Sequence, residues 1–266
     1  MAESEKDQKE KNDNNNNSSF QNEENKEKSK DSSSFFDNTL DFKDVEVLQF
    51  DNNEYNQVDL SFKVIVIGNS GVGKSSIIER ATKNRFLEDY QATIGFDYCS
   101  FFIKYNNKII KLQIWDTCGQ EIYQSLITNF YRNSSLAFLV YAINDRNSFD
   151  NLDLWIKDLK KESNPDAKTI LIGNKADLES ERQVKYEEAE KYSKDLNFVS
   201  FYEASARTGL NAQKVFIKAA ITLYEDYIKY SEEKDSFAES EKDSKESSQK
   251  LTKKSKKNQK RKSGCC

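Results

Sequence analysis

The sequence predicts an α/β fold, with helices on both faces of a mostly parallel sheet. Short runs of β-branched and aromatic residues alternate with longer segments of helical period in the middle of the chain, a pattern typical of parallel sheets with crossover helices. Apolar residues make up only 36% of the chain, less than globular proteins usually contain. Because the shortfall lies at the two ends, the folded domain is expected to span residues 60–230.

The strands are expected where apolar runs are short and uninterrupted. The first, "SFKVIVIG", ends in a glycine that marks a turn. "CSFFIKYNNKIIKLQIWD" contains two strands joined at "NN", a hairpin that adds one antiparallel edge strand. In chain order the expected strands are residues 61–68, two within 99–116, then 135–143, 168–173 and 197–205.

The helices are expected between these strands, where apolar residues recur every three or four positions. Their ranges are 75–82, 148–161, 185–196 and 211–230. Ligands of such sheets bind at the carboxyl ends of the strands, so the loops that follow the strands are the candidate site.

The two ends of the chain are expected to be largely disordered. Residues 1–59 form a low-complexity extension rich in Asn, Glu, Lys and Ser, with too little apolar surface to offset the entropy of ordering. Within it, residues 35–59 contain apolar residues without a clear period, which leaves docking on the domain open. Residues 231–266 are expected to be a flexible tail, with eight basic residues and no acidic one from Lys250 to Lys262.

Composition excludes several classes of chemistry. The chain contains no histidine, which rules out His-based metal binding and catalysis. No apolar segment follows Met1 and no 18-residue apolar stretch occurs, so neither a secretory signal nor a membrane span is expected. The four cysteines, at 99, 118, 265 and 266, lack the spacing of a disulfide framework, which indicates a reducing compartment.

A phosphate-binding loop is predicted between the first strand and the first helix. "GNSGVGKS" at 68–75 matches G-x-x-x-x-G-K-[ST] in full and in the required context, which disfavours a merely connecting turn. Its backbone N–H groups and the helix N-terminus can surround phosphate oxygens. Lys74 is expected to reach the β- and γ-phosphates, and the Ser75 hydroxyl to bind Mg²⁺. The residues expected around the phosphates are Ser70, Gly71, Val72, Gly73, Lys74, Ser75 and Ser76.

A second loop predicts that the base is guanine. "LIGNKADL" at 171–178 follows a predicted strand on the ligand side of the sheet. A carboxylate accepts two hydrogen bonds from guanine, at N1–H and the exocyclic amine, and adenine offers no such pair. Asp177 is assigned to this contact, Lys175 to the face of the base, and Asn174 to a tie with the phosphate loop.

A third loop, "EASART" at 203–208, follows the last predicted strand. The Ala206 N–H is expected to meet the guanine O6, with Ser205 and Arg207 beside it. An isolated N-K-x-D segment is often a plain polar turn, but its position after a complete phosphate loop favours base recognition.

Two more loops are expected to sense the γ-phosphate. In "QIWDTCGQE", Asp116 can hold Mg²⁺ through a water, the Gly119 N–H can approach the γ-phosphate, and Gln120 can orient the attacking water. In "QATIG", the Thr93 hydroxyl is expected to bind Mg²⁺ only when the γ-phosphate is present. The candidate catalytic residues are Gln120, Lys74 and Thr93.

These stretches, in this order and spacing, resemble the small GTPases of the Ras superfamily, and within it the Rab family. "IGFDY", "KLQIWDTCGQE", "FYRNSS" and "LVYAINDRNSF" stand where Rab proteins carry their characteristic segments. The resemblance covers residues 60–230 and the last residues. It implies a six-stranded sheet with five helices, GTP or GDP with Mg²⁺, slow hydrolysis stimulated by an activating protein, and regulation of vesicle traffic by a monomer.

The resemblance also implies roles for four aromatic residues. Phe86 matches the side chain that packs edge-on against guanine, and Tyr98, Trp115 and Phe130 match a trio that contacts effectors. Other implied partners are an exchange factor, an escort protein and a dissociation inhibitor. The chain departs from the family at Cys118, where Ala is usual, which leaves its hydrolysis rate open; "EIY" at 121–123, "YAI" at 141–143 and Arg207 also differ from the usual residues.

The chain ends in two adjacent cysteines behind the basic run, Cys265 and Cys266. A disulfide between neighbours is strained, and two thiols without histidine make a poor metal site. A C-a-a-X signal would need Cys where Ser263 stands. The Rab resemblance implies geranylgeranyl groups on both cysteines, hence the cytoplasmic face of an endomembrane with a cytosolic pool; "SLITNFYRNSS" and "LESERQVKYEEAE" lean to the Golgi and early secretory route.

Two other functions are weighed against a hydrolysing switch. A scaffold that stays GTP-bound would be expected to lack Gln120 or Thr93, and both are present. A nucleic-acid binder could use the basic tail, but the tail has no interleaved aromatics and no nucleic acid is expected as a partner.

Overall fold

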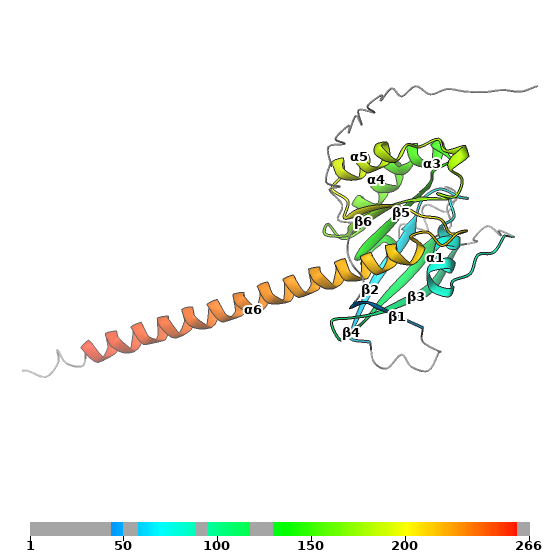
Figure 1. Cartoon of the computed structure of the whole chain (residues 1–266). Coiled ribbons are helices and arrows are strands. Elements are labelled where there is room, and N and C mark those ends of the chain that lie inside the picture. Colours follow the sequence, from blue (N-terminus) through cyan, green and yellow to red (C-terminus); the bar gives the residue numbers. More distant parts are fainter. Residues whose placement is uncertain (1–43, 50–57, 89–94, 118–129, 260–266) are drawn as a thin grey trace, which may run out of the picture. The chain divides into compact units, whose positions relative to one another are not determined.

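The computed structural model describes residues 44–49, 58–88, 95–117 and 130–259 and has the expected α/β architecture (Figure 1). The strands are β1 (Glu46–Leu48), β2 (Leu60–Ile67), β3 (Phe96–Tyr105), β4 (Lys108–Thr117), β5 (Leu136–Ala142), β6 (Lys168–Asn174) and β7 (Ser200–Glu203). The helices are α1 (Lys74–Lys83), α3 (Arg146–Asp150), α4 (Leu152–Glu162), α5 (Tyr186–Asp195) and α6 (Ala212–Gln259), with a 3₁₀ helix, η4 (Glu179–Glu181).

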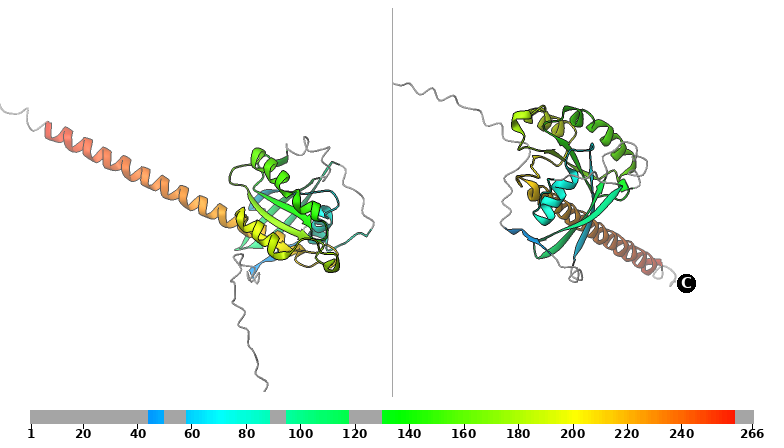
Figure 2. Two further views of the ribbon diagram at one scale, coloured as in Figure 1. Left: turned by 90° about the horizontal axis from the view of Figure 1, so that it is seen from above. Right: turned by 90° about the vertical axis from the view of Figure 1, so that its right-hand side faces the viewer.

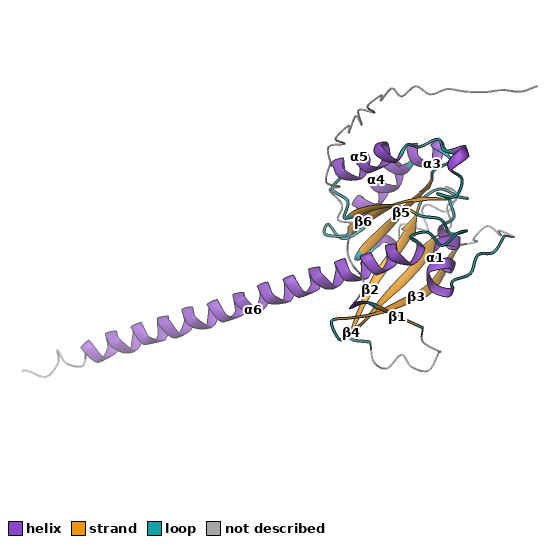
Figure 3. Cartoon of the chain, in the orientation of Figure 1, coloured by secondary structure: helices purple, strands orange, loops and turns teal. Residues whose placement is uncertain are grey.

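One sheet contains all these strands, in the order β1-β3-β4-β2-β5-β6-β7 (Figure 3). The four pairs from β4 to β7 are parallel, and the two pairs that include β3 are antiparallel. The turn between β3 and β4 is made by Asn106 and Asn107, which both have positive φ, 49° and 59°. Two successive left-handed residues are what a tight hairpin requires, so the hairpin expected from "NN" is confirmed.

Side chains of the sheet alternate between two hydrophobic cores. Val64 and Val66 of β2 pack with α1 and the first part of α6, whereas Ile65 and Ile67 pack with α3, α4 and α5. Helices therefore cover both faces, and α3–α5 lie on the opposite side of the sheet from α1 (Figure 2). The helix expected at 148–161 is divided, since α3 ends at Asp150 and α4 begins at Leu152.

The seventh strand is a correction to the expected six. β1 comes from the extension expected to be mostly disordered, and it pairs antiparallel with β3, Glu46 opposite Lys104 and Leu48 opposite Phe102. Val45 and Val47 pack against the core on the α1 side. An edge strand presents unpaired N–H and C=O groups, and β1 pairs this part of β3 from within the same chain.

The added strand is expected to contribute measurably to stability. Val47→Asn removes apolar packing and is expected to cost about 1 kcal/mol, which lowers Tm by roughly 2–4 °C for a domain of this size. Glu46→Asn is the matched control, because Glu46 is exposed on the same strand. Thermal unfolding of both variants checks this. A Val47→Asn variant with the same Tm as Glu46→Asn would mean that β1 does not pack on the domain in solution.

Helix α6 is longer than the predicted helix at 211–230 and runs to Gln259. A flexible coil was expected after Tyr230, but the structure shows helix from there to Gln259. No glycine or proline interrupts residues 212–259, and the many Glu and Lys residues favour helix. Its described side chains are buried only as far as Leu223. Among the described residues, no helix combines the length and apolarity that a membrane span would need.

Candidate functional site

The candidate site is a cleft of about 530 Å³ at the carboxyl ends of β2, β6 and β7. It brings together the three loops that the sequence assigns to phosphate and base recognition. The predicted site residues that line it are Gly71, Gly73, Ser76, Phe86, Asn174, Lys175, Asp177, Ala206 and Arg207. Leu87, Glu88 and Leu178 also line the cleft and were not predicted.

The phosphate loop surrounds the buried ammonium group of Lys74. This Nζ donates to the carbonyl oxygens of Gly68 and Asn69, both at 2.8 Å, and the side chain is 6% exposed. Gly71 and Gly73 have positive φ, 78° and 92°, which leaves the loop N–H groups free to turn inward. Helix α1 begins at Lys74 with no acidic residue in its first turn, so its N-terminus favours an anion.

Asn174 joins all three loops. Its Nδ2 donates to the Val72 carbonyl oxygen at 2.8 Å, and its Oδ1 accepts from the Ala206 N–H at 3.2 Å. The side chain is 1% exposed, and a Cβ at Gly73 would lie 2.3 Å from its Nδ2. The tie between the base loop and the phosphate loop expected from the sequence is thus present, and it requires glycine at position 73.

The residues predicted to recognise the base line the same cleft. Asp177 is exposed, and its Oδ1 accepts from the Ser205 hydroxyl at 2.6 Å, which orients the carboxylate. Lys175 has a left-handed backbone, φ 63°. The Ala206 N–H, expected at the guanine O6, donates in this structure to Asn174. Half-buried Phe86 packs against the core on the α1 side.

Ser75 and Asp116 fit a magnesium site. The Ser75 hydroxyl donates to Asp116 Oδ2, while Asp116 Oδ1 is buried without a hydrogen-bond partner among the described residues. Burial raises the pKa of Asp116 to about 6, against the lowering effect of the Ser75 hydrogen bond. Mg²⁺ takes oxygen ligands and keeps several waters, so this unpaired carboxylate oxygen suits a bound water or cation. Thr93, Gly119, Gln120 and Cys118 lie outside the described residues, as do Cys265 and Cys266.

The predicted aromatic trio forms one cluster. The ring of Trp115 lies 5.3 Å from that of Tyr98 and 5.4 Å from that of Phe130. Phe96, which is not one of the predicted residues, joins the cluster with its ring 4.5 Å from that of Phe130, and it is 53% exposed. The predicted effector surface is therefore built from four aromatic side chains.

Two further side chains support the loops and carry no motif in the sequence. Trp155 Nε1 of α4 donates to Asn69 Oδ1 of the phosphate loop at 2.8 Å. Arg80 of α1 donates from Nε to the Ala206 carbonyl oxygen at 2.7 Å and from Nη2 to that of Arg207 at 2.8 Å. Both contacts join distant parts of the chain, so no local sequence pattern predicts them.

A sequence model of the Ras family matches residues 63–225. The match covers more than half of the 266-residue chain and includes the phosphate loop, both base loops and the aromatic cluster. It begins after β1 and ends within α6.

Proposed function

Since the chain belongs to the Ras family of small GTPases, we propose that it is a Rab-type switch that binds GTP, hydrolyses it slowly and regulates vesicle traffic. The observation that carries the proposal is the meeting of three loops in one cleft, through the hydrogen bonds of Asn174 to Val72 and from Ala206. This geometry supports simultaneous recognition of the phosphates by one loop and of the base by the other two.

The residues divide the work according to their chemistry. Lys74 and the phosphate-loop N–H groups neutralise the phosphates, while Asp177 selects guanine. Ser75 and Asp116 hold Mg²⁺, which neutralises charge on the phosphates when bound. Gln120 orients the attacking water, and Thr93 senses the γ-phosphate. The nucleotide state is then transmitted to the surface of Tyr98, Trp115 and Phe130, where effectors are expected to bind.

Hydrolysis is tested with Gln120→Leu. Leucine fills a similar volume but has no group that holds the water, so the variant should keep bound GTP far longer than the wild-type chain. Single-turnover decay of bound GTP, measured with and without cell extract, checks this. The wild-type rate should rise in extract, because no arginine in the chain is assigned to the γ-phosphate.

Two other results of this measurement are informative. An unchanged GTP half-life in Gln120→Leu would contradict the assignment of Gln120. A wild-type chain that holds GTP without hydrolysis, even in extract, would favour a GTP-bound scaffold.

The Rab assignment includes membrane attachment and a set of regulators. We expect geranylgeranyl groups on Cys265 and Cys266, added with an escort protein and extracted by a dissociation inhibitor, and an exchange factor that reloads GTP. The expected location is the cytoplasmic face of an endomembrane with a cytosolic pool, and imaging of the tagged full-length chain against Golgi and endosomal markers tests it.

A further inference from the structure

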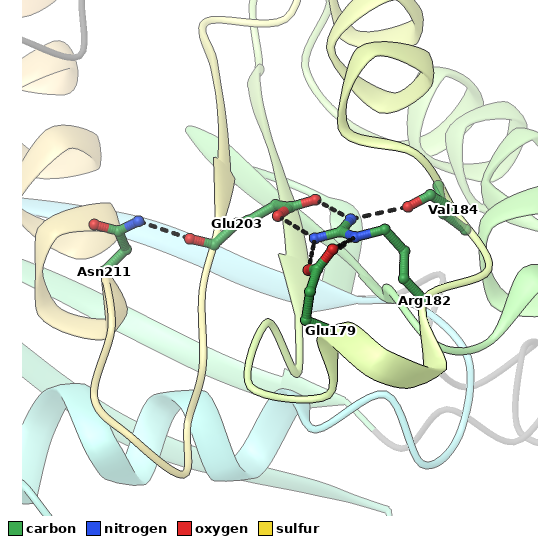
Figure 4. A network of polar contacts seen from close by, with 5 residues as sticks. All are labelled: Glu179, Arg182, Val184, Glu203 and Asn211. Atoms are coloured by element: carbon green, nitrogen blue, oxygen red, sulfur yellow. Dashed lines mark hydrogen bonds and ion pairs between the residues drawn. The ribbon is translucent and has the colours of Figure 1, made fainter. Parts of the chain in front are cut away.

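Arg182 occupies the centre of a polar network beside the base loops (Figure 4). Its Nη1 and Nη2 donate to Oε1 and Oε2 of Glu203 at 2.6 and 2.8 Å. Nη1 also donates to the Val184 carbonyl oxygen at 2.9 Å. On the solvent side, Nε and Nη2 bond to Glu179 at 2.6–2.9 Å. The guanidinium thus makes a bidentate ion pair with Glu203, and its Nε–Nη2 edge pairs with Glu179.

This ion pair joins the two base loops at their outer ends. Arg182 lies five residues after Asp177, and Glu203 ends β7 directly before the loop that contains Ser205 and Ala206. Glu203 is itself fixed, because its carbonyl oxygen accepts from Asn211 Nδ2 at 2.7 Å. The side chains of Arg182 and Glu203 are only 18% and 14% exposed, so the pair is screened far less than one on the open surface.

Packing does not hold the segment that contains Asp177. Asn174 and Val184 are buried, but none of the residues between them is, and η4 has no buried side chain. Polar contacts therefore determine where Asp177 lies. At the near end of the segment, the Ala176 N–H donates to the Ala204 carbonyl oxygen at 3.0 Å, and the Ser205 hydroxyl donates to Asp177. At the far end, the charged, bidentate contacts of Arg182 are the strongest.

We propose that Arg182, through its fork on Glu203, is a positioning residue for guanine recognition: it holds the Asp177 loop against the Ser205–Ala206 loop and so sets how long the nucleotide stays bound. The inference rests on the proposed reading of the base by Asp177. The Arg182–Glu203 pair acts on the guanine-specific contact and not only on the stability of the fold.

The test compares release of GDP with release of IDP, whose base lacks the exocyclic amine. Asp177 can make two hydrogen bonds to guanine but only one to hypoxanthine, so the wild-type chain should release IDP faster than GDP. Arg182→Gln removes the charge and the fork. It is expected to speed GDP release about tenfold and IDP release clearly less, because Arg182 is coupled to the contact that Asp177 makes with the exocyclic amine. The ratio of the IDP release rate to the GDP release rate should therefore fall.

Three variants serve as controls. Arg146→Gln breaks another arginine–glutamate ion pair, in which Nη1 of Arg146 donates to both oxygens of Glu188 at 2.8 and 2.9 Å. This pair joins α3 to α5, and neither residue lines the cleft. Arg146→Gln should leave the ratio unchanged, as should Glu179→Gln, since Glu179 is 68% exposed and such pairs contribute little. Arg182→Lys keeps the charge without the fork and should restore part of the discrimination.

The result that overturns the inference is equal acceleration of GDP and IDP release by Arg182→Gln, or no acceleration. A second measurement keeps this independent of folding: in an Asp177→Ala background, Arg182→Gln should not speed GDP release further, and additive effects would contradict positioning through Asp177. A wild-type chain that releases GDP and IDP at the same rate would overturn the base assignment to Asp177 itself, which distinguishes that failure from failure of the positioning role alone.

Discussion

Asp177→Ala is expected to weaken binding of GDP and GTP by about a hundredfold, because it removes a charged acceptor of two hydrogen bonds. Asp177 is exposed and lines the cleft. Within the part of the chain that the structure describes, its carboxylate accepts one side-chain hydrogen bond, from the Ser205 hydroxyl at 2.6 Å, so its loss should not unfold the domain. Equilibrium titration with a fluorescent GDP analogue measures the change, and Tm of the variant shows whether the fold is kept.

The matched control is Asp166→Ala, an exposed aspartate just before β6, at the end of the strand opposite the cleft. It should bind GDP like the wild-type chain. Competition with ATP completes the experiment. Wild-type protein that binds ATP as tightly as GTP would contradict guanine selection by this loop, whatever Asp177→Ala does.

The core of the fold was predictable because its signals are local. Continuous apolar runs located β2, β5 and β6, and "NN" located the turn that Asn106 and Asn107 make with positive φ. β1 was not predictable, since Val45 and Val47 form too short an alternation and gain stability only from the edge of β3. Tertiary pairing of this kind overrides local preference.

The candidate site likewise combines residues that have a local sequence signal with residues that have none. Glycines and the Lys–Ser pair of the phosphate loop follow a spacing that the chemistry itself imposes. The supporting residues obey no such spacing: Trp155 reaches Asn69 from 86 positions away, and Arg80 reaches Ala206 from 126 positions away. An arginine that pairs with a glutamate after a long loop, as Arg182 does with Glu203, looks in sequence like any surface charge. Only the fold places it at the base loops.

The length of α6 was missed for an energetic reason. Beyond Leu223 no described side chain of the helix is buried, so the apolar period that predicts a packed helix disappears. What remains is intrinsic propensity, from a long segment without glycine or proline. In place of a coil with an average span of roughly 30–35 Å, residues 231–259 as a helix extend about 43 Å along its axis. The chain thereby gains a stiff spacer between its domain and its last residues.

The proposed lipidation of Cys265 and Cys266 leads to the last prediction. The Cys265→Ser/Cys266→Ser variant, expressed in cells, is expected to shift from membranes to the cytosol almost completely, because a single lipid chain binds only marginally and this variant would carry none. Fractionation of the tagged full-length chain measures the shift, and mass spectrometry of the C-terminal peptide from wild-type protein should find both thiols modified.

A second variant separates the effect of the proposed lipids from that of the basic run. Replacement of Lys253, Lys254, Lys256 and Lys257 by alanine leaves both cysteines in place and removes up to about 1 kcal/mol per lysine of attraction to an anionic leaflet. It should weaken membrane binding in part, where the cysteine variant abolishes it. If the double cysteine variant stays on membranes, or the wild-type peptide carries two free thiols, the anchor lies elsewhere in the chain. If instead the lysine variant alone detaches completely, charge and not lipid dominates the attachment.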